Sequence, residues 1–387
     1  MKKILALLLA VVLCCSSFAL ALSAEEGNPQ KPALQCNATS AILMEYETGT
    51  VIYEQNADEK LPPASITKIM TLLLVMEAIE AGKMTLEETV TASEEAASMG
   101  GSQIFLKVGE QMSVRDLLKS VVIASANDAA VALAEHLCGS VDAFVGQMNE
   151  KAKALGMENT HFENTNGLDD TTKEHYTSAR DVAIMSRALI AHPLILEFSS
   201  IWMDSIRDGA FGLTNTNRLV RFYPGATGLK TGSTAKARFC ISATAKRDDM
   251  HLIAVIMGAP TRDIRNEEAK RLLDFGFANY QLYKDEGAEF GEIPVLGGKN
   301  DVCRVKNADF SILVPKGSAG KIQKKENLPA EIFAPIQAGE KIGSVEYTLD
   351  GKVIGNADVC ASESVEKIAW SDILLRLLRI CFCVGNG

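Results

Sequence analysis

Short apolar runs around a polar turn mark the first patterned part of the chain. Residues 40–44 and 51–53 are mostly apolar and flank a Glu-Thr-Gly turn at 47–49, which predicts a β-hairpin. From Pro62 the apolar positions take the spacing of one helix face, and this spacing continues until Gly82. The residues that define this predicted helix are Ile66, Ile69, Met70, Leu73, Met76 and Ile79.

Two more helices are indicated by residue pairs that suit a helix N-terminus. Ser113 is followed three residues later by Asp116, and Ser178 is followed by Asp181. A serine hydroxyl at the first position accepts a hydrogen bond from a backbone N–H of the first turn, so each pair predicts a helix start. Helical spacing also extends over 128–137 and 267–279.

After the helices, the spacing of apolar residues is again typical of β-strands. Residues 238–245 and 251–257 are rich in β-forming residues, and the charged segment 246–249 separates them, which predicts a second hairpin. Strands at both ends with helices between them predict one mixed α+β domain, whose antiparallel sheet is assembled from both ends of the segment. We expect this domain to span residues 25–284.

The last hundred residues have a different pattern of apolar and polar positions from the preceding domain. Residues 285–364 form short alternating runs broken by glycine and proline, which predicts a small all-β domain. Residues 365–387 form a tail whose apolar positions follow one helix face, with two arginines on the other face. We interpret the tail as an amphipathic helix on a membrane surface; the alternative is a helix packed on the protein itself. Its stripe comprises Trp370, Ile373, Leu374, Leu377, Leu378 and Cys381, opposite Arg376 and Arg379.

Residues 1–24 have the features of a secretory signal peptide. Two lysines precede an apolar stretch from Ile4 to Leu13, and small residues at Ala19, Ala21 and Ala24 offer cleavage sites. An uncleaved anchor is the alternative, but the apolar stretch is short for a membrane span. The sequence therefore predicts export, to the outer face of the cytoplasmic membrane or the cell wall.

The charge balance and the cysteine and histidine content narrow the function. The chain has 39 Lys and Arg against 49 Asp and Glu, a net charge of −10, so a nucleic-acid partner is not expected. The nine cysteines show no paired C-x-x-C spacing, and the five histidines form no H-E-x-x-H motif. We expect neither a metal nor an organic cofactor.

The start of the predicted helix at Pro62 carries the first candidate site. Ser65 and Lys68 are three residues apart, so they share one helix face, and a neutral amine there can take the hydroxyl proton. The helix N-terminus points backbone N–H groups toward an anion forming beside the serine. On its own the pair has a simpler interpretation, in which Ser65 only caps the helix.

Two further segments have side chains that suit the same chemistry. Ser125 and Asn127 fall between two predicted helices, where a hydroxyl relays protons and an amide binds a substrate backbone; ordinary turn chemistry is the alternative. Lys230, Thr231 and Gly232 precede the strand at 238–245. An edge strand there pairs with an extended peptide while the lysine and threonine hold its anionic end; the alternative is a solvated lysine in a turn.

The three motifs in this order are far more specific than any one alone. S-x-x-K, S-x-N and K-T-G are the signature of penicillin-binding proteins and class A β-lactamases. With the segments PPASITKIMT, SAND, HFENTNGLD and TGLKTGST, nearly the whole chain resembles the serine-type D-alanyl-D-alanine carboxypeptidases, the low-molecular-mass penicillin-binding proteins. The resemblance implies an α/β penicillin-recognising domain, similar to serine transpeptidases and β-lactamases, followed by a β-rich domain.

The resemblance also implies roles for individual residues. Ser65 is the expected nucleophile, Lys68 its general base, Ser125 a proton relay and Asn127 a partner of the substrate amide. Lys230 and Thr231 are expected to bind the terminal carboxylate, beside Gly232. The expected oxyanion hole consists of the backbone N–H groups of Ser65 and Ser233.

The implied function is removal of the terminal D-alanine from peptidoglycan stem peptides, with β-lactam antibiotics as covalent inhibitors. A β-lactamase, a peptidoglycan endopeptidase and a non-catalytic wall-binding protein remain alternatives. His161, Asn164 and Gly167 are interpreted as structural. Arg265 is interpreted as a surface ion-pairing residue because Glu267 and Glu268 follow it.

Overall fold

The computed structural model describes residues 34–383, so the predicted signal peptide at 1–24 lies outside the described residues. A five-stranded antiparallel sheet in the order β2-β1-β9-β8-β7 is the frame of the first domain. It joins the two predicted hairpins, since β1 pairs with β9 and places Ala41 opposite Ile256. The strands are β1 (Ser40–Glu45), β2 (Val51–Gln55), β7 (Ala226–Thr234), β8 (Arg238–Arg247) and β9 (Met250–Ala259).

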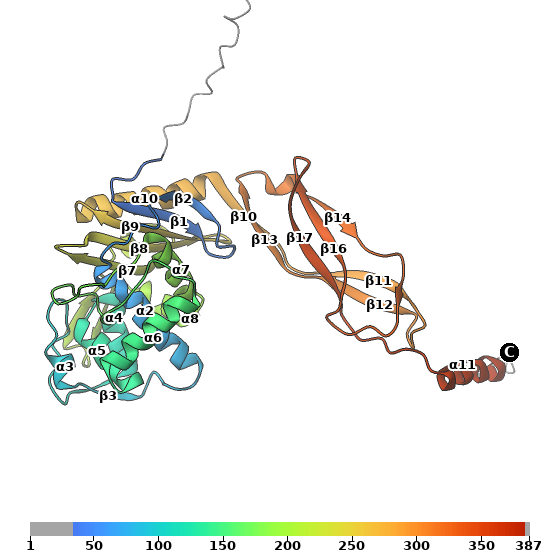
Figure 1. Ribbon diagram of the computed structural model, residues 1–387, viewed down its shortest axis with the longest axis horizontal. Coiled ribbons are helices and arrows are strands. Elements are labelled where there is room, and N and C mark those ends of the chain that lie inside the picture. Colours follow the sequence, from blue (N-terminus) through green and yellow to red (C-terminus); the bar gives the residue numbers. More distant parts are fainter. Residues whose placement is uncertain (1–33, 384–387) are drawn as a thin grey trace, which may run out of the picture. The chain divides into compact units, whose positions relative to one another are not determined.

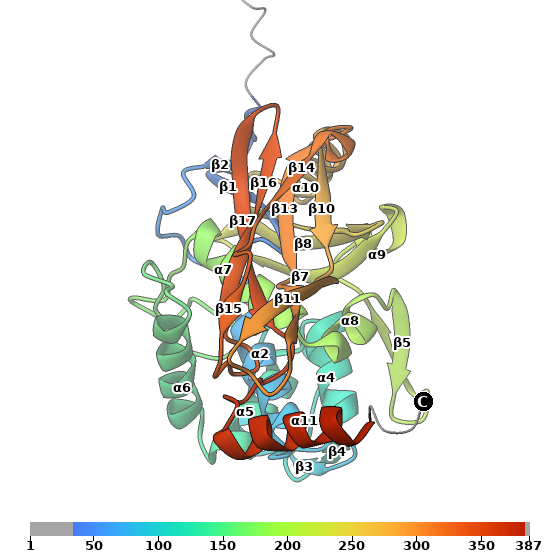
Figure 2. The ribbon, with the colours of Figure 1, turned by 90° about the vertical axis from the view of Figure 1, so that its right-hand side faces the viewer.

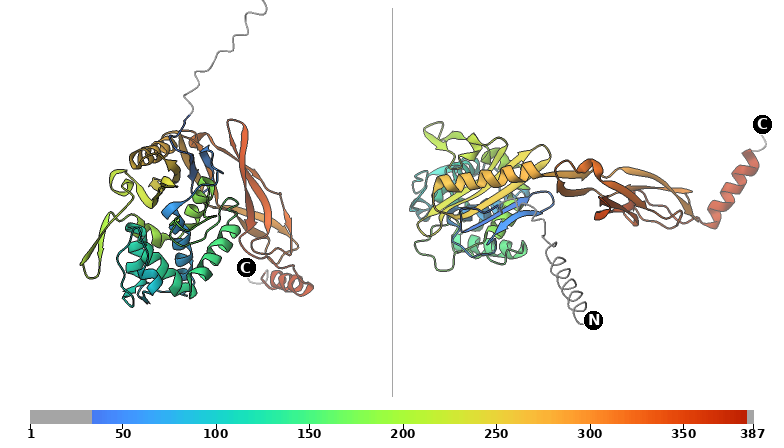
Figure 3. Two further views of the ribbon diagram at one scale, coloured as in Figure 1. Left: turned by 60° about the vertical axis from the view of Figure 1, so that its left-hand side comes forward. Right: turned by 90° about the horizontal axis from the view of Figure 1, so that it is seen from above.

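Helices cover both faces of this sheet. Helix α10 lies along one face and α7 packs against the other, where the remaining helices gather (Figure 1; Figure 3, right). The predicted caps form, because the Ser113 and Ser178 hydroxyls accept hydrogen bonds from the Asp116 and Asp181 N–H groups at 3.1 Å. The helices are α2 (Lys68–Glu80), α3 (Glu94–Ala97), α4 (Val114–Ile123), α5 (Asn127–Cys138), α6 (Val141–Ala154), α7 (Ala179–Ile190), α8 (Pro193–Ser199), α9 (Leu219–Phe222) and α10 (Arg262–Asn279).

Two predicted helix starts were wrong. Helix α10 begins at Arg262 rather than residue 267, because the Thr261 hydroxyl caps it by accepting from the Ile264 N–H at 3.1 Å. The helix predicted from Pro62 begins as a 3₁₀ turn, η1 (Ala64–Thr67), and becomes α-helical only at Lys68. Helix α2 is buried on nearly all sides, as expected for a central helix that is apolar all round.

Two small antiparallel strand pairs and helices α3, α6, α8 and α9 were not among the predicted elements. The pairs are β3 (Thr89–Thr91) with β4 (Gln111–Ser113) and β5 (Met203–Ile206) with β6 (Phe211–Thr214). Strands of three or four residues are too short for a recognisable alternation.

The C-terminal region is all-β, as predicted. A six-stranded sheet has the order β14-β16-β17-β12-β11-β15, and Figure 2 shows the long β16–β17 pair. The predicted boundary after residue 284 falls inside β10, which pairs with β13 along its length, so we propose a boundary at Asn279. The strands are β10 (Tyr280–Asp285), β11 (Glu289–Leu296), β12 (Val302–Asn307), β13 (Phe310–Pro315), β14 (Gln323–Asn327), β15 (Ile332–Phe333), β16 (Lys341–Leu349) and β17 (Lys352–Ala361).

A glycine fixes the contact between a loop and the turn η1. Gly167 has a φ of +85°, and a Cβ atom at this position would lie 1.8 Å from the Ala64 carbonyl oxygen and 2.8 Å from Thr67 Oγ1. Both the backbone conformation and the space therefore require glycine. The loop from residue 161 to 176 packs directly on the turn that carries Ser65.

We expect Gly167→Ala to lower the free energy of unfolding by at least ~3 kcal/mol, because backbone must move to admit the methyl group. Gly146→Ala is the control: this glycine lies inside α6 with open space around it, and alanine should stabilise the helix by ~0.5–1 kcal/mol. Urea-induced unfolding measures both. Equal stability of the Gly167→Ala protein and the parent would contradict the contact.

Candidate active site

The turn η1 presents Ser65 at the start of the central helix. Ala64, just before it, has a φ of +48°, a strained value for a residue with a side chain. In a 3₁₀ turn the side chains at i and i+3 eclipse one another, which aligns Ser65 with Lys68. The Lys68 Nζ lies 3.0 Å from the Ser65 Oγ.

The Lys68 amine is fully buried among oxygen atoms. Its Nζ donates to the Asn127 Oδ1 at 2.5 Å and to the Asn166 carbonyl at 2.8 Å. Burial holds the pKa of Lys68 well below its usual value, and the positive charge of Lys230 lowers it further, against a weaker opposing effect of Asp128. A neutral amine has two N–H donors and one lone pair. If the two donors bind Asn127 and Asn166, the lone pair faces the Ser65 hydroxyl.

Ser125 lies between α4 and α5, as predicted, and is buried in a left-handed conformation with a φ of +63°. The Lys230 Nζ donates to the Ser125 Oγ at 2.7 Å and to the Thr231 carbonyl at 2.9 Å. Burial lowers the pKa of Lys230 to about 7, with a smaller contribution from the charge of Arg265. The hydroxyl of Ser125 is thus held by one of two buried lysines.

The residues after Ser125 hold one wall of the cleft. The Asn127 side chain donates to the Gly100 carbonyl, and its backbone N–H donates to the Ser102 carbonyl, both at 2.7 Å. The buried Asp128 carboxylate accepts from the Ile104 and Leu106 N–H groups at 3.0–3.2 Å. The SAND segment therefore both contacts Lys68 and fixes the loop around Ser102.

Strand β7 forms the other wall. It is the edge strand of the sheet and contains the K-T-G motif itself. A Cβ atom on Gly232 would lie 2.9 Å from the Ser65 backbone nitrogen, so glycine lets β7 approach the serine turn. The Thr231 Oγ1 donates to the Thr216 Oγ1 at 2.8 Å, and Ser233 is exposed. The glycine that we assigned to substrate approach is also needed for contact between the two walls.

Arg265 was interpreted wrongly as a surface residue. It is 3% exposed and lines the cleft. Its guanidinium donates to the Asn266 side-chain oxygen at 2.9 and 3.1 Å, and Glu268 pairs with Arg271 instead. Burial, with smaller electrostatic contributions, lowers the pKa of Arg265 to about 10, so it remains a cation at neutral pH.

The cleft between the walls has a volume of about 190 Å³. It brings together Ser65, Ser125, Thr231, Gly232 and Ser233, with the amines of Lys68 and Lys230 buried beneath them. Sequence reasoning did not assign four other residues to the cleft, which come from three separate segments, because two of them lie on α10. They are Ser102, Thr216, Arg262 and Arg265.

The loop that contains His161, Asn164 and Gly167 supports the site through its backbone. The Asn164 Oδ1 accepts from the N–H groups of Asn166 and Gly167, at 3.2 and 2.7 Å. This turn presents the Asn166 carbonyl to Lys68. The sequence does not reveal this contact, because every residue has a backbone carbonyl whatever its side chain.

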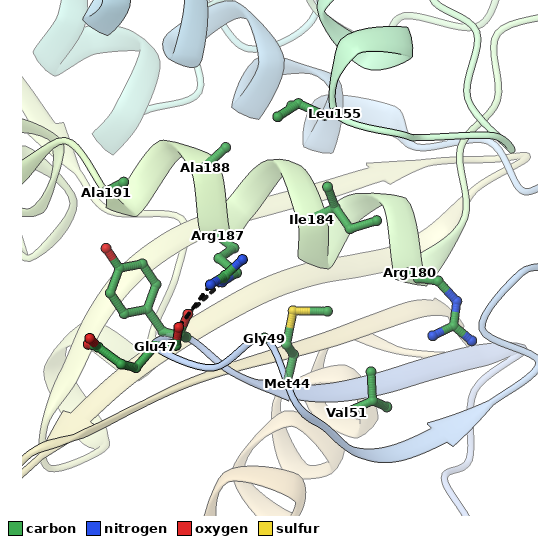
Figure 4. A pocket seen from close by; sticks show the side chains of 11 residues that line it. Met44, Glu47, Gly49, Val51, Leu155, Arg180, Ile184, Arg187, Ala188 and Ala191 are labelled. Atoms are coloured by element: carbon green, nitrogen blue, oxygen red, sulfur yellow. Dashed lines mark hydrogen bonds between the residues drawn. The ribbon is translucent and has the colours of Figure 1, made fainter. Parts of the chain in front are cut away.

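Two other features lie outside the cleft. A cavity of about 660 Å³ between the β1–β2 turn and α7 contains none of the motif residues; there Arg187 donates to the Tyr46 and Glu47 carbonyls (Figure 4). Among the described residues, no three His, Cys, Asp or Glu side chains group as metal ligands would.

Three features define the active-site-serine, penicillin-recognising class of enzymes. They are a serine beside a buried lysine whose pKa is lowered, a second serine held by a second lysine, and an edge strand along the cleft. The comparisons with known proteins agree. The family model described as D-alanyl-D-alanine carboxypeptidase matches residues 25–261, and that of the C-terminal domain of penicillin-binding protein 5 matches residues 277–367. The chain belongs to the D-alanyl-D-alanine carboxypeptidase family, serine hydrolases that act on peptidoglycan and bind β-lactams.

Individual relatives align over most of the chain. It is 42% identical to the D-alanyl-D-alanine carboxypeptidase DacF of Bacillus subtilis, over 98% of both chains, and 36% identical to DacC of Escherichia coli, over 89% of this chain and 88% of that one. The crystal structure of penicillin-binding protein 5 from Haemophilus influenzae superposes with a TM-score of 0.77 at 35% identity, covering 86% of this chain and 98% of that one. The similarity thus includes both domains.

Proposed function

We propose that this enzyme removes the C-terminal D-alanine from peptidoglycan stem peptides, with Ser65 as the acylated nucleophile. The single observation that carries the assignment of the nucleophile is the 3.0 Å contact between the Ser65 hydroxyl and the buried amine of Lys68. A lysine is a base only when it is neutral, and its burial without a bonded carboxylate favours that form.

Acylation begins when Ser65 Oγ attacks the penultimate carbonyl and its proton passes to Lys68 Nζ. The negative charge on the carbonyl oxygen is stabilised by the backbone N–H groups of Ser65 and Ser233, which the approach at Gly232 brings near each other. The C–N bond then breaks, and the proton reaches the leaving nitrogen through Lys68 and Ser125. D-alanine departs and an ester on Ser65 remains.

Deacylation repeats the same steps with water. Lys68, neutral again, takes a proton from a water molecule that attacks the ester carbonyl, and the proton returns to Ser65 Oγ. Asn127 binds the peptide amide of the acyl chain while it also holds Lys68. Each proton removed is thereby returned, and the enzyme is regenerated without a cofactor.

The cleft favours a carboxypeptidase over a β-lactamase. None of the residues that line it carries a carboxylate that could activate water for rapid hydrolysis of a β-lactam ester. Glu163, a glutamate of the loop that packs on η1, is exposed and accepts hydrogen bonds from the Lys173 and Glu174 N–H groups instead. The adduct with a penicillin should therefore persist for many minutes.

Incubation with benzylpenicillin should add one penicilloyl group to the peptide that contains Ser65, as measured by mass spectrometry. Ser65→Ala should give no adduct, and Lys68→Arg should acylate about two to four orders of magnitude more slowly, because it keeps the charge but loses the base. Release of D-alanine from a D-Ala-D-Ala peptide is measured alongside. An adduct on Ser125, or near-normal acylation of Lys68→Arg, would reject the assignment.

Lys230 and Thr231 are proposed to bind the terminal carboxylate. Lys230→Ala should lower kcat/KM for a free-acid peptide by about 30-fold or more, and much less for the same peptide with an amidated C-terminus. Lys236→Ala is the control, because Lys236 belongs to the same segment but is exposed and bonded to the Asp169 carbonyl. Equal losses on both peptides would assign Lys230 to the chemistry or to the structure instead.

The tail is proposed to hold the exported enzyme at the outer face of the cytoplasmic membrane. Helix α11 (Trp370–Cys383) exposes Trp370, Leu374 and Leu377 by 54–86%. No single helix among the described residues is long and apolar enough to cross a bilayer, so the tail would lie along the surface. The side chains of residues 376 and 379–383 lie outside the description.

Truncation after Ala369 should release the mature protein from anionic vesicles in a sedimentation assay and leave hydrolysis of a soluble peptide unchanged. It keeps the last contact of the β domain, in which the Ile368 N–H donates to the Gly297 carbonyl. Leu374→Ser with Leu378→Ser, which keeps length and charge, should also release the protein because the apolar face drives binding. Failure of the full-length mature protein to bind vesicles would contradict the proposal.

A further inference from the structure

A second hollow opens beside the catalytic cleft and shares two residues with it. Its volume is about 550 Å³, and Thr216 and Arg262 line both spaces. Trp202 and Phe222 form an aromatic wall, with their rings 6.1 Å apart in an edge-to-face arrangement. Thr214 of β6 also lines it and is exposed. The hollow adjoins the site at these two residues and is far larger than a methyl group.

The hollow lies near the position expected for the side chain of the leaving residue. In the proposed reaction the carboxylate of that residue binds at Thr231, whose hydroxyl is bonded to Thr216. A side chain is attached to the carbon next to that carboxylate, so it starts beside Thr216. The hollow on the other side of Thr216 therefore lies nearer to the side chain of the leaving residue than to the acyl part of the peptide.

The chemistry of the walls suits an apolar side chain on an anionic residue. The rings of Trp202 and Phe222 line the hollow and provide apolar contact area, and the Arg221 guanidinium lies 5.5 and 5.4 Å from their centroids. Phe222 is 65% exposed, so part of its ring is open to a ligand in the hollow. The guanidinium groups of Arg218 and Arg262 line the same hollow and have no hydrogen-bond or ion-pair partner among residues 34–383, so they favour a negatively charged ligand.

We propose that this hollow is the subsite for the side chain of the leaving residue, and that the enzyme also removes C-terminal D-amino acids with apolar side chains as large as leucine. The inference rests on the proposed function, since it places the leaving carboxylate at Thr231. Alanine leaves the hollow empty, whereas a D-leucine side chain contacts Trp202 and Phe222.

The test compares two peptides that differ only in the last residue, D-Ala-D-Ala and D-Ala-D-Leu. The unmodified enzyme should hydrolyse both, with kcat/KM values within about tenfold of each other. Thr214→Trp fills the hollow from β6 and should lower the ratio of the D-Leu to the D-Ala value by about tenfold or more. A ratio is used because general damage to the fold lowers both values together.

Thr89→Trp is the matched control, because Thr89 is an exposed threonine on the separate antiparallel pair of β3 and β4, and it should leave the ratio unchanged. Hydrolysis of the D-Ala peptide without hydrolysis of the D-Leu peptide would overturn the inference and leave the proposed function intact. An unchanged ratio in Thr214→Trp would also overturn it. Hydrolysis of neither peptide would reject the proposed function and the inference with it.

Discussion

The site depends on the burial of an amine that has no carboxylate bonded to it. Charging Lys68 in this environment is costly, so the neutral form is favoured and the lone pair is available to Ser65. Three oxygen contacts, from Ser65, Asn127 and Asn166, place the nitrogen. They come from three separate segments, and the rest of the first domain serves to bring these segments together.

Two glycines set how closely those segments meet. Gly167 brings the loop that carries Asn166 against the turn η1, and Gly232 brings β7 against the same turn from the other side. The turn is thus held between a loop and a sheet edge, which accounts for the positive φ at Ala64. The strain at Ala64, next to the proposed nucleophile, is offset by packing contacts that only glycine allows at these two positions.

The basic residues around the cleft differ in how deeply they are buried. Lys68 and Lys230 are buried and have lowered pKa values, Arg265 is buried but remains charged, and Arg262 is exposed. Neutral amines suit proton transfer, and permanent cations suit recognition of an anion. In the proposed mechanism Lys68 handles the proton beneath Ser65, whereas Lys230 and Thr231 bind the terminal carboxylate and Arg265 lines the cleft as a permanent cation.

The sequence alone determined the local features: the capped starts at Ser113 and Ser178, the two hairpins, the all-β region and the three motifs. Each depends on residues close together in the chain, whose spacing reports directly on geometry. Arg265, Thr216, Ser102 and the Asn166 carbonyl were decided only by the tertiary structure. Their roles arise from contacts across long stretches of chain, and a charged residue beside acidic neighbours resembles a surface residue until burial separates them.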